Sequence, residues 1–274
     1  MSLRSFIDAA ADPDLTIAVL DEDGGGSGPL EGLLADAFEG VPGIDVESAV
    51  AADVVAPDGL EIDGETAIAF DDGEPVAATP LFELYDSLLA INSDLFVTGA
   101  RGLGDVELPD VLAALSETRF ALRGYPLAHK EKLLLILVSR CVERVAWEAN
   151  DGTLRAGFQR LSRIDDEIGT RKAYAKLAET AVDVHLYGAD RGASRSEDAL
   201  EGLDATVHAG SSAEHRDSWF VVYAPEKLPA SDGETEPTPA ALVALETDPR
   251  VWEGFWTTDP ERVGAIESHI AETL

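Results

Sequence analysis

The strongest constraint on this fold is the segment 127–149 (LAHKEKLLLILVSRCVERVAWEA), which has the length and periodicity of a long helix. One face carries apolar residues at helical spacing: Leu134, Val138, Cys141 and Val145. Further apolar residues widen that surface well beyond one stripe: Leu133, Leu135, Ile136, Leu137 and Val142. Such a helix must be buried on two sides.

Two arrangements would bury the helix in this way. We expect it to lie against a sheet formed by the second half of the chain, with Val138 facing that sheet. Leu135 is then expected at an outer position, where it would contribute to a homodimer or to the surface for a partner protein. A helix sandwiched between the two halves of the same chain satisfies the same pattern.

Acidic residues are spread through nearly every segment, with 53 Asp and Glu against 20 Lys and Arg and a formal net charge of −33. This charge excludes an ordinary nucleic-acid binder, which needs a basic surface. It indicates a halophilic protein, because at molar salt the Debye length is about 3 Å and surface carboxylates hardly repel one another. Most Asp and Glu side chains are therefore assigned to surface solvation rather than to catalysis.

No segment has the pattern of a membrane span or a secretion signal. The longest uninterrupted aliphatic run, 133–138, is far shorter than the roughly 20 residues that cross a bilayer. The first residues carry acids where a signal peptide needs an apolar segment, so we expect a cytoplasmic location. Cys141 is the only cysteine, which excludes an internal disulfide and a cysteine-rich zinc site.

The expected elements divide the chain into an N-terminal region, 1–115, and a second domain, 116–274. For the N-terminal region the pattern predicts strands at 15–20, 44–56, 66–70 and 95–98, a hairpin turn at 71–73, and helices at 29–38, 81–91 and 109–115. For the second domain it predicts helices at 127–149, 171–180 and 260–272, strands at 154–161, 182–187, 205–208, 219–223, 241–245 and 254–257, and a mobile polar loop at 225–239. The expected fold class is α/β to α+β, with mixed sheets and flanking helices.

Two glycine-rich loops follow predicted strands, but neither has a nucleotide-binding motif. The loop from Gly24 to Gly28 lies between a strand and a helix, where α/β folds hold phosphate groups. It lacks the Gly-Lys-Ser/Thr of a P-loop and the GxGxxG fingerprint, and three acids precede it directly. A surface turn is the better interpretation, and the segment 99–104 (GARGLG) is no stronger. An enzyme or nucleotide-binding protein that uses the first loop stays the alternative function.

The remaining reactive residues form no catalytic or metal-binding set. His129 lies near the start of the long helix, but the chain lacks the ATP-binding half of a histidine kinase. The other histidines show no metal-ligand spacing: His185, His208, His215 and His269. No serine lies in a nucleophile elbow, and Cys141 on an apolar helix face is expected to be an inert thiol. We therefore expect no enzyme activity, and no cofactor is indicated.

Segments of the second half follow one another in a recognisable order: HKEKLLLILVSRCVERVAWE, GTLRAGFQRLSRI, RKAYAKLAETAVDVHLYGA, DSWFVVYA, AALVALE and VWEGFWTTDPERVGAIESHI. Together they resemble the DICT domain, a sensory domain named for its occurrence with diguanylate cyclases and two-component proteins. The resemblance covers about residues 116–274, and its best parts are 143–147, Phe158 with Gln159, and 253–259. The N-terminal region resembles that of stand-alone haloarchaeal members of the family.

The resemblance implies a cytosolic sensory module for signal transduction and supplies no catalytic residues. Members with several domains carry an output domain such as a cyclase, a kinase or a helix-turn-helix, and this sequence shows none. We therefore expect a non-catalytic module that passes its signal to a separate protein, such as a two-component sensor or regulator. A transcriptional regulator is the less favoured alternative, because basic residues concentrate only at 155–163 and 171–176, where acids balance them.

A ligand pocket is predicted among the strands of the second half. Its candidate residues combine aromatic rings with polar groups that could orient a ligand: Phe158, Gln159, Trp219, Tyr223, Glu253 and Trp256. Strand alternation puts Trp219, Val221 and Tyr223 on one face, and it sends the neighbours Phe255 and Trp256 to opposite faces. Simple core packing of the aromatic rings is the alternative explanation.

Overall fold

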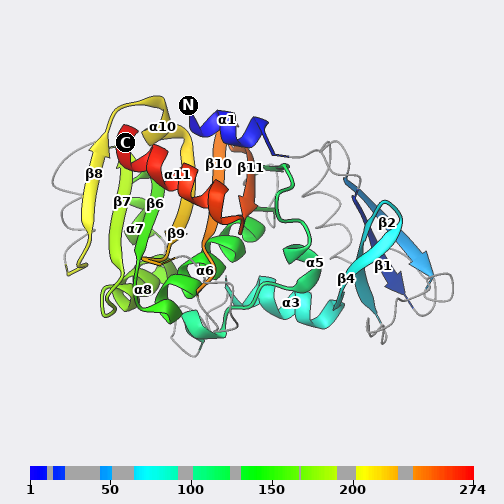
Figure 1. Cartoon of the computed structure of the whole chain (residues 1–274). Coiled ribbons are helices and arrows are strands. Elements are labelled where there is room, and N and C mark those ends of the chain that lie inside the picture. The colour runs from blue at the N-terminus through cyan, green and yellow to red at the C-terminus, as the bar shows by residue number, and fades with distance from the viewer. Residues whose placement is uncertain are drawn as a thin grey trace.

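Two β-sheets organise the chain, as the computed structural model in Figure 1 shows. The structure describes residues 1–10, 15–21, 44–50, 65–91, 101–123, 131–166, 168–189, 202–227 and 237–274. The first sheet has the strand order β2-β1-β3-β4, with β1 at Leu15–Asp21, β2 at Ile44–Val50, β3 at Thr66–Asp71 and β4 at Glu74–Pro80. Strands β1 and β2 run parallel, whereas β3 is antiparallel to both of its neighbours.

The second sheet has seven strands in the order β5-β11-β10-β9-β6-β7-β8. Their bounds are β5 Phe120–Arg123, β6 Thr153–Arg160, β7 Asp183–Ala189, β8 Thr206–Gly210, β9 Ser218–Ala224, β10 Ala240–Asp248 and β11 Val251–Thr257. Strands β6, β7 and β8 are parallel to one another, and the remaining pairs are antiparallel. The predicted class, mixed sheets with flanking helices, is confirmed.

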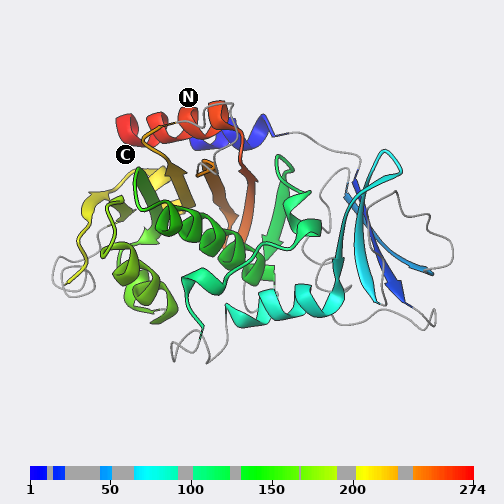
Figure 2. The same cartoon turned by 60° about the horizontal axis from the view of Figure 1, so that its bottom comes forward.

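Helices cover both faces of the seven-stranded sheet. The helices are α1 Leu3–Asp8, α3 Leu81–Ala90, α5 Asp110–Ala113, α6 Glu131–Ala149, α7 Arg163–Asp166, α8 Ile168–Leu177, α10 Ala213–Asp217 and α11 Pro260–Thr273, with a 3₁₀ turn η2 at Leu103–Asp105. The buried residues of α6 and α8 pack on one face of this sheet, and those of α1 and α11 pack on the other. Figures 1 and 2 show α1 and α11 side by side, across the sheet from α6.

The long helix α6 owes its two-sided burial to its own chain. One core cluster joins Leu134 and Leu137 of α6 to Leu242 of the seven-stranded sheet, and also to Leu84 of α3 and Ile17 of the first sheet. Figure 2 shows α6 with the seven-stranded sheet above it and α3 below it. The sandwich between two halves of the chain is therefore the arrangement that the structure has.

The expectation that Leu135 lies at an outer position is wrong. Its exposed fraction is 1%, and that of Val138 is 2%, so both side chains are core residues. The sequence pattern showed that two sides of α6 are covered, but not that both covers come from the same chain. The homodimer stays a prediction without the argument from Leu135.

The hairpin predicted at 71–73 joins β3 to β4. Asp72 and Gly73 have φ angles of 49° and 80°. Positive φ at both central positions is what a two-residue type I′ turn requires, and an Asp-Gly pair accommodates it. This local signal was therefore sufficient to place the turn.

The N-terminal helix α1, which the sequence patterns did not predict, lies on the seven-stranded sheet. Its residues Leu3, Phe6 and Ile7 are buried with Phe255 and Ile266 of the C-terminal segment. Residues from both ends of the chain thus build one layer. The division at residues 115 and 116 stays a prediction.

The other expected elements compare with the structure as follows. The strands at 15–20 and 66–70, the helices at 81–91 and 260–272, and the strands of the second half are confirmed within one to three residues at each end. The helix expected at 171–180 begins earlier, at Ile168, and ends at Leu177, where the Thr180 hydroxyl donates to the Leu177 carbonyl. Short β5, α7 and α10 were not predicted. The helix at 29–38, the strand at 95–98, residues 51–56 of the strand at 44–56, and residues 228–236 of the loop at 225–239 lie outside the described residues.

Replacing Gly254 by alanine is expected to lower the free energy of unfolding by about 1–3 kcal/mol, the usual cost of overpacking. A Cβ atom there would lie 2.5 Å from the Val243 carbonyl oxygen and 2.8 Å from the Phe120 ring. Gly264 in α11 is the matched control, because a Cβ there meets no atom within 4 Å. Gly264→Ala should stabilise the helix by up to about 1 kcal/mol. Equal unfolding midpoints of the two variants in denaturant titrations would contradict the packing described for β11.

Candidate functional site

A small cavity of about 30 Å³ lies beneath α6, where β6, β9 and the α7–α8 segment meet it. It is lined by Ile136, Ser139, Arg140, Glu143, Phe158, Arg163, Thr170, Trp219 and Val221. A buried water molecule needs a cavity volume of roughly 10–15 Å³, so this cavity has room for about two water molecules. We call this space, with its lining residues, the α6 cavity.

The polar side of the α6 cavity is a buried ion pair on the helix itself. Arg140 and Glu143, one helical turn apart, form a salt bridge, and their side chains are 6% and 1% exposed. Arg140 Nη2 also donates to Thr170 Oγ1 of α8 at 2.6 Å. Burial, and after it the Glu143 carboxylate, raises the pKa of the Tyr174 hydroxyl well above its usual value. Two charges are therefore held in the interior by partners on two helices, an arrangement that is costly in desolvation.

The apolar side of the cavity comes from neighbouring strands of the sheet. Phe158 of β6 is the register partner of Trp219 of β9, and the Phe158 ring meets Tyr174 edge to face at 5.4 Å. The indole nitrogen of Trp219 donates to Ser139 Oγ at 3.1 Å, and Ser139 Oγ donates to the Leu135 carbonyl at 2.8 Å. The indole thus links the sheet to α6 at the cavity.

Two of the six predicted pocket residues, Phe158 and Trp219, line the α6 cavity. Gln159 lies beside it, with a φ of 60°, and accepts a hydrogen bond from Arg163 of the lining. The Gln159 amide nitrogen donates to Glu246 of β10 at 2.6 Å. The structure therefore brings half of the predicted set to one place.

The other three predicted residues lie elsewhere and hold the fold together. Tyr223 donates to Asp151 Oδ1 at 3.2 Å beyond the far end of β9. Glu253 pairs with two arginines: Arg4 of α1 at 2.8 Å and Arg119 at 3.3 Å. Trp256 packs in the core with its ring centroid 5.5 Å from that of Phe120. None of the three is among the residues that line the α6 cavity.

The predicted strand faces are confirmed. Trp219, Val221 and Tyr223 all pack on the α6 side of the sheet. Phe255 lies in the cluster under α11, whereas Trp256 lies in the cluster under α6. Alternation along a strand was a sufficient guide at these positions.

The sequence patterns missed the polar half of the cavity: Ser139, Arg140, Glu143, Arg163 and Thr170. One signal was present, because Arg140 and Glu143 are ionisable residues three apart inside a helix with a broad apolar surface. On a helix that must be buried on two sides, charged residues at such positions are candidates for an internal ion pair.

A second cluster of titratable groups lies at the edge of the same sheet, on β7 and β8. His185 Nδ1 lies 2.9 Å from His208 Nε2, and His185 Nε2 lies 2.9 Å from Asp183 Oδ2. The Tyr187 ring stacks on His208 at 4.3 Å, and Arg155 donates to the Tyr187 hydroxyl at 2.6 Å. Within the part of the chain that the structure describes, no group of three or more His, Cys, Asp or Glu could hold a metal ion.

The histidine pair predicts a pH dependence. The pKa of His208 is lowered, first by burial and then by the charges of His185, Arg155 and His215. Because the unfolded chain then binds protons more readily than the folded protein, stability should fall as the pH drops below about 6.5. In His208→Phe, which can keep the stacking on Tyr187, the melting temperature should change less between about pH 7.5 and about pH 5.5 than in the wild type. An unchanged pH dependence in this variant would contradict the contribution of His208.

Cys141, which was expected from the sequence to be an unreactive thiol, is buried on α6. Burial raises the pKa of the Cys141 thiol to about 12, as expected for an inert cysteine. The loop from Gly24 to Gly28 and His129 lie outside the described residues. Among the helices that the structure describes, none has both the length and the apolar character needed to span a bilayer.

Comparison with known protein families gives a match over the part of the chain that contains the α6 cavity. Residues 110–231 match the family model DICT, described as "Sensory domain in DIguanylate Cyclases and Two-component system". No curated protein and no solved structure matches the chain. All residues that line the α6 cavity, and the histidine pair, lie inside the matched segment.

Proposed function

Because this chain carries a DICT sensory domain at residues 110–231, we propose that the protein is a non-catalytic sensory module that passes a signal to a separate partner protein. The partner is a signalling protein such as a two-component sensor or regulator, and the setting is the cytoplasm. The observation that carries the proposal is the α6 cavity. It is an interior space with charged, hydroxyl and aromatic groups, and it lies wholly within the matched segment.

The proposed sensing step is a displacement of α6 by a ligand in the cavity. The cavity has room for about two water molecules, so a metabolite that binds there would move α6 and the sheet apart. The contact to break is the hydrogen bond from the Trp219 indole to Ser139 of α6. Such a ligand binds the separated state better than the closed one, which is the condition for shifting a two-state equilibrium.

The far side of α6 offers a path for the signal. Leu84 of α3 belongs to the same core cluster as Leu134 and Leu137 of α6. A close-packed interface of this kind responds to a shift of one helix by repacking its neighbours. The proposed signal therefore travels from the cavity through α6 to α3 and the first sheet.

The test is to identify what the protein binds in its own cell. Protein purified at molar KCl from its native cytoplasm is denatured, and the released small molecules are analysed by absorption spectroscopy and mass spectrometry. We expect the wild type to release a molecule in stoichiometric amount. Ser139→Leu, which fills the cavity and removes the hydroxyl that accepts a hydrogen bond from the Trp219 indole, should release none, whereas the control Gly264→Ala should release as much as the wild type.

Two results would contradict the proposal. Equal release from Ser139→Leu and the wild type would place the ligand away from the α6 cavity. A wild-type preparation without any bound molecule would remove the support for sensing by a small ligand. Turnover of the released molecule by the purified protein would favour the enzyme alternative.

A further inference from the structure

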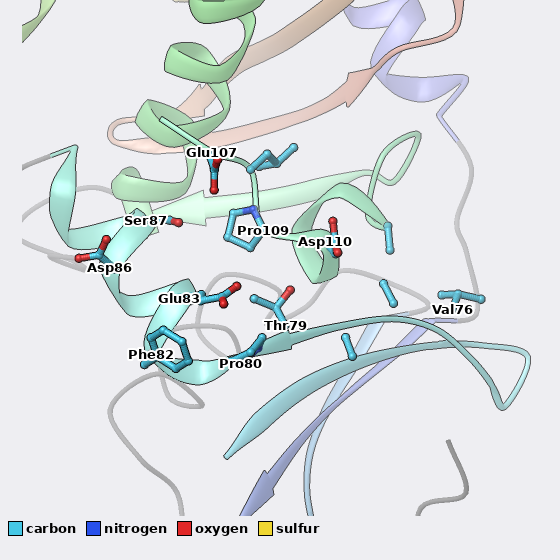
Figure 3. Close-up of a pocket in the computed structure, with 14 residues that line it drawn as sticks. Val76, Thr79, Pro80, Phe82, Glu83, Asp86, Ser87, Glu107, Pro109 and Asp110 are labelled. Atoms are coloured by element: carbon cyan, nitrogen blue, oxygen red, sulfur yellow. The ribbon is translucent and has the colours of Figure 1, made fainter. Parts of the chain in front are cut away.

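A broad groove of about 1020 Å³ follows the free edge of the first sheet (Figure 3). Its walls are β4, the first two turns of α3, and the segment 107–114 that contains α5. Figure 3 shows Phe82 and Glu83 of α3 on one side of the opening and Glu107 and Asp110 on the other. We call this space the β4 groove.

Strand β4 borders the groove with its edge rather than with one face. It is the last strand in the order β2-β1-β3-β4, so one side of its backbone pairs with β3 and, within the described part of the chain, the other side meets no strand. The groove is lined by five consecutive residues, 76–80. Side chains alternate between the two faces of a strand, so consecutive lining residues mean that the edge borders the groove. The edge is most exposed at Val76, whereas Thr79 is 3% exposed and accepts a hydrogen bond from the backbone N–H of Val111 in α5. An exposed edge is a template for pairing with another strand.

The groove also gathers exposed apolar side chains. Phe82 is 70% exposed and Val76 is 49% exposed, and both line the groove. Among the described residues, only two other large hydrophobic side chains are as strongly exposed to solvent: Met1 and Val207. Exposed aromatic and apolar groups beside an open edge are typical of a surface that a partner covers.

The charge of the groove defines the chemistry of that partner. Four carboxylates line it: Glu83, Asp86, Glu107 and Asp110. Asp86 pairs with Arg101 at 2.7 Å. For the other three, the described part of the chain provides no basic partner. An occupant that brings arginine or lysine side chains would therefore meet complementary charge.

We infer that the β4 groove binds an extended, basic segment of the partner protein, which adds as a strand to the edge of β4. Its backbone pairs with residues 76–78, apolar side chains at its two ends cover Val76 and Phe82, and its basic side chains meet the carboxylates of α3 and of the segment 107–114. The inference rests on the proposed function in assuming a separate partner. The new part is the place where that partner docks. The groove includes α3, which packs on α6, so a partner bound there contacts the helix that is proposed to carry the signal.

The test uses a defined probe, a fluorescein-labelled decapeptide of alternating valine and arginine, titrated into the full-length protein while fluorescence anisotropy is recorded. A second decapeptide with the same charge, in which the central valines are prolines, cannot pair as a strand and serves as the comparison. We expect the first peptide to bind at least about tenfold more tightly than the second. Hydrogen exchange of the amides in 76–78 should slow only in the presence of the first peptide.

Variants localise the binding. Phe82→Ala removes a side chain that is 70% exposed, so the fold should persist, and binding should weaken about tenfold. Val207→Ala, on the edge strand β8 of the other sheet, is the matched control and should bind like the wild type. Val76→Pro blocks the edge of β4, and circular dichroism establishes whether this variant is folded before its binding is compared.

Three results would overturn the inference. Equal affinity for both peptides would show attraction by the acidic surface alone. An unchanged affinity of Phe82→Ala would place the binding elsewhere. A dimer in sedimentation velocity that Phe82→Ala converts to a monomer would make a second copy of this chain the occupant. None of these results affects the release of a molecule from the α6 cavity, so this inference and the proposed function can fail separately.

Discussion

Replacing Glu143 by leucine is expected to lower the free energy of unfolding by about 3–5 kcal/mol, because it breaks the buried Arg140–Glu143 ion pair and removes one of its two charges. Arg140 is 6% exposed, and it also donates to the Thr170 hydroxyl at 2.6 Å. A neutral hydroxyl cannot replace a carboxylate in compensating a buried guanidinium. The measurement is denaturant unfolding followed by circular dichroism, at a salt concentration that keeps the wild type folded.

Two controls separate the ion pair from the substitution itself. Glu148→Leu makes the same change on the same helix at a side chain that is 51% exposed, and it should cost less than about 1 kcal/mol. The double variant Arg140→Met with Glu143→Leu removes both charges and should recover much of the loss. If Glu143→Leu unfolds at the same denaturant concentration as Glu148→Leu, the pair is not buried as described.

Lowering the salt concentration is expected to destabilise the whole protein markedly. The net charge is −33, and the Debye length grows from about 3 Å at molar salt to about 10 Å at 0.1 M, so repulsion between carboxylates reaches further. The melting temperature should therefore fall between molar and about 0.1 M KCl, by roughly 2–4 °C for each kcal/mol of stability lost. NaCl at equal ionic strength should act like KCl, because screening depends on ionic strength. Equal melting temperatures at both salt concentrations would rule out halophilic adaptation.

Local patterns were sufficient for the elements whose burial repeats regularly. The periodicity of α6 and the Asp72-Gly73 turn are properties of short segments, and the structure has both. What covers α6 is not local: its outer side contacts α3, which is distant in the sequence and belongs to the same core cluster as residues of the first sheet. For this reason the position of Leu135 could not be derived from the helix alone.

Strand alternation also has a limit at this site. It placed Trp219, Val221 and Tyr223 correctly on one face of β9. At Gln159 the φ angle is 60°, and the pairing of β6 with β7 shifts register between Gly157 and Arg160. A bulge of this kind changes the direction of a side chain without a clear mark in the sequence.

The polar groups were the least predictable part of both clusters. In a chain with 53 acidic residues, one more glutamate in a helix is most simply assigned to the surface. His185 and His208 are far apart in the sequence, and only the parallel pairing of β7 with β8 brings their strands together. Such contacts depend on the topology of the sheet, which the local patterns did not determine.

Hydrogen exchange of Ser139→Leu, compared with the wild type by mass spectrometry, tests most directly the claim that α6 links the cavity to the first sheet. The leucine side chain is larger than the serine that it replaces and takes up the space of the cavity, so we expect it to push α6 away from β9, as the proposed ligand does. We predict faster exchange of the amides in α3, which packs on α6, and unchanged exchange in α11, on the opposite face of the sheet. Unchanged exchange in α3, or an equal increase in α3 and α11, would contradict the account.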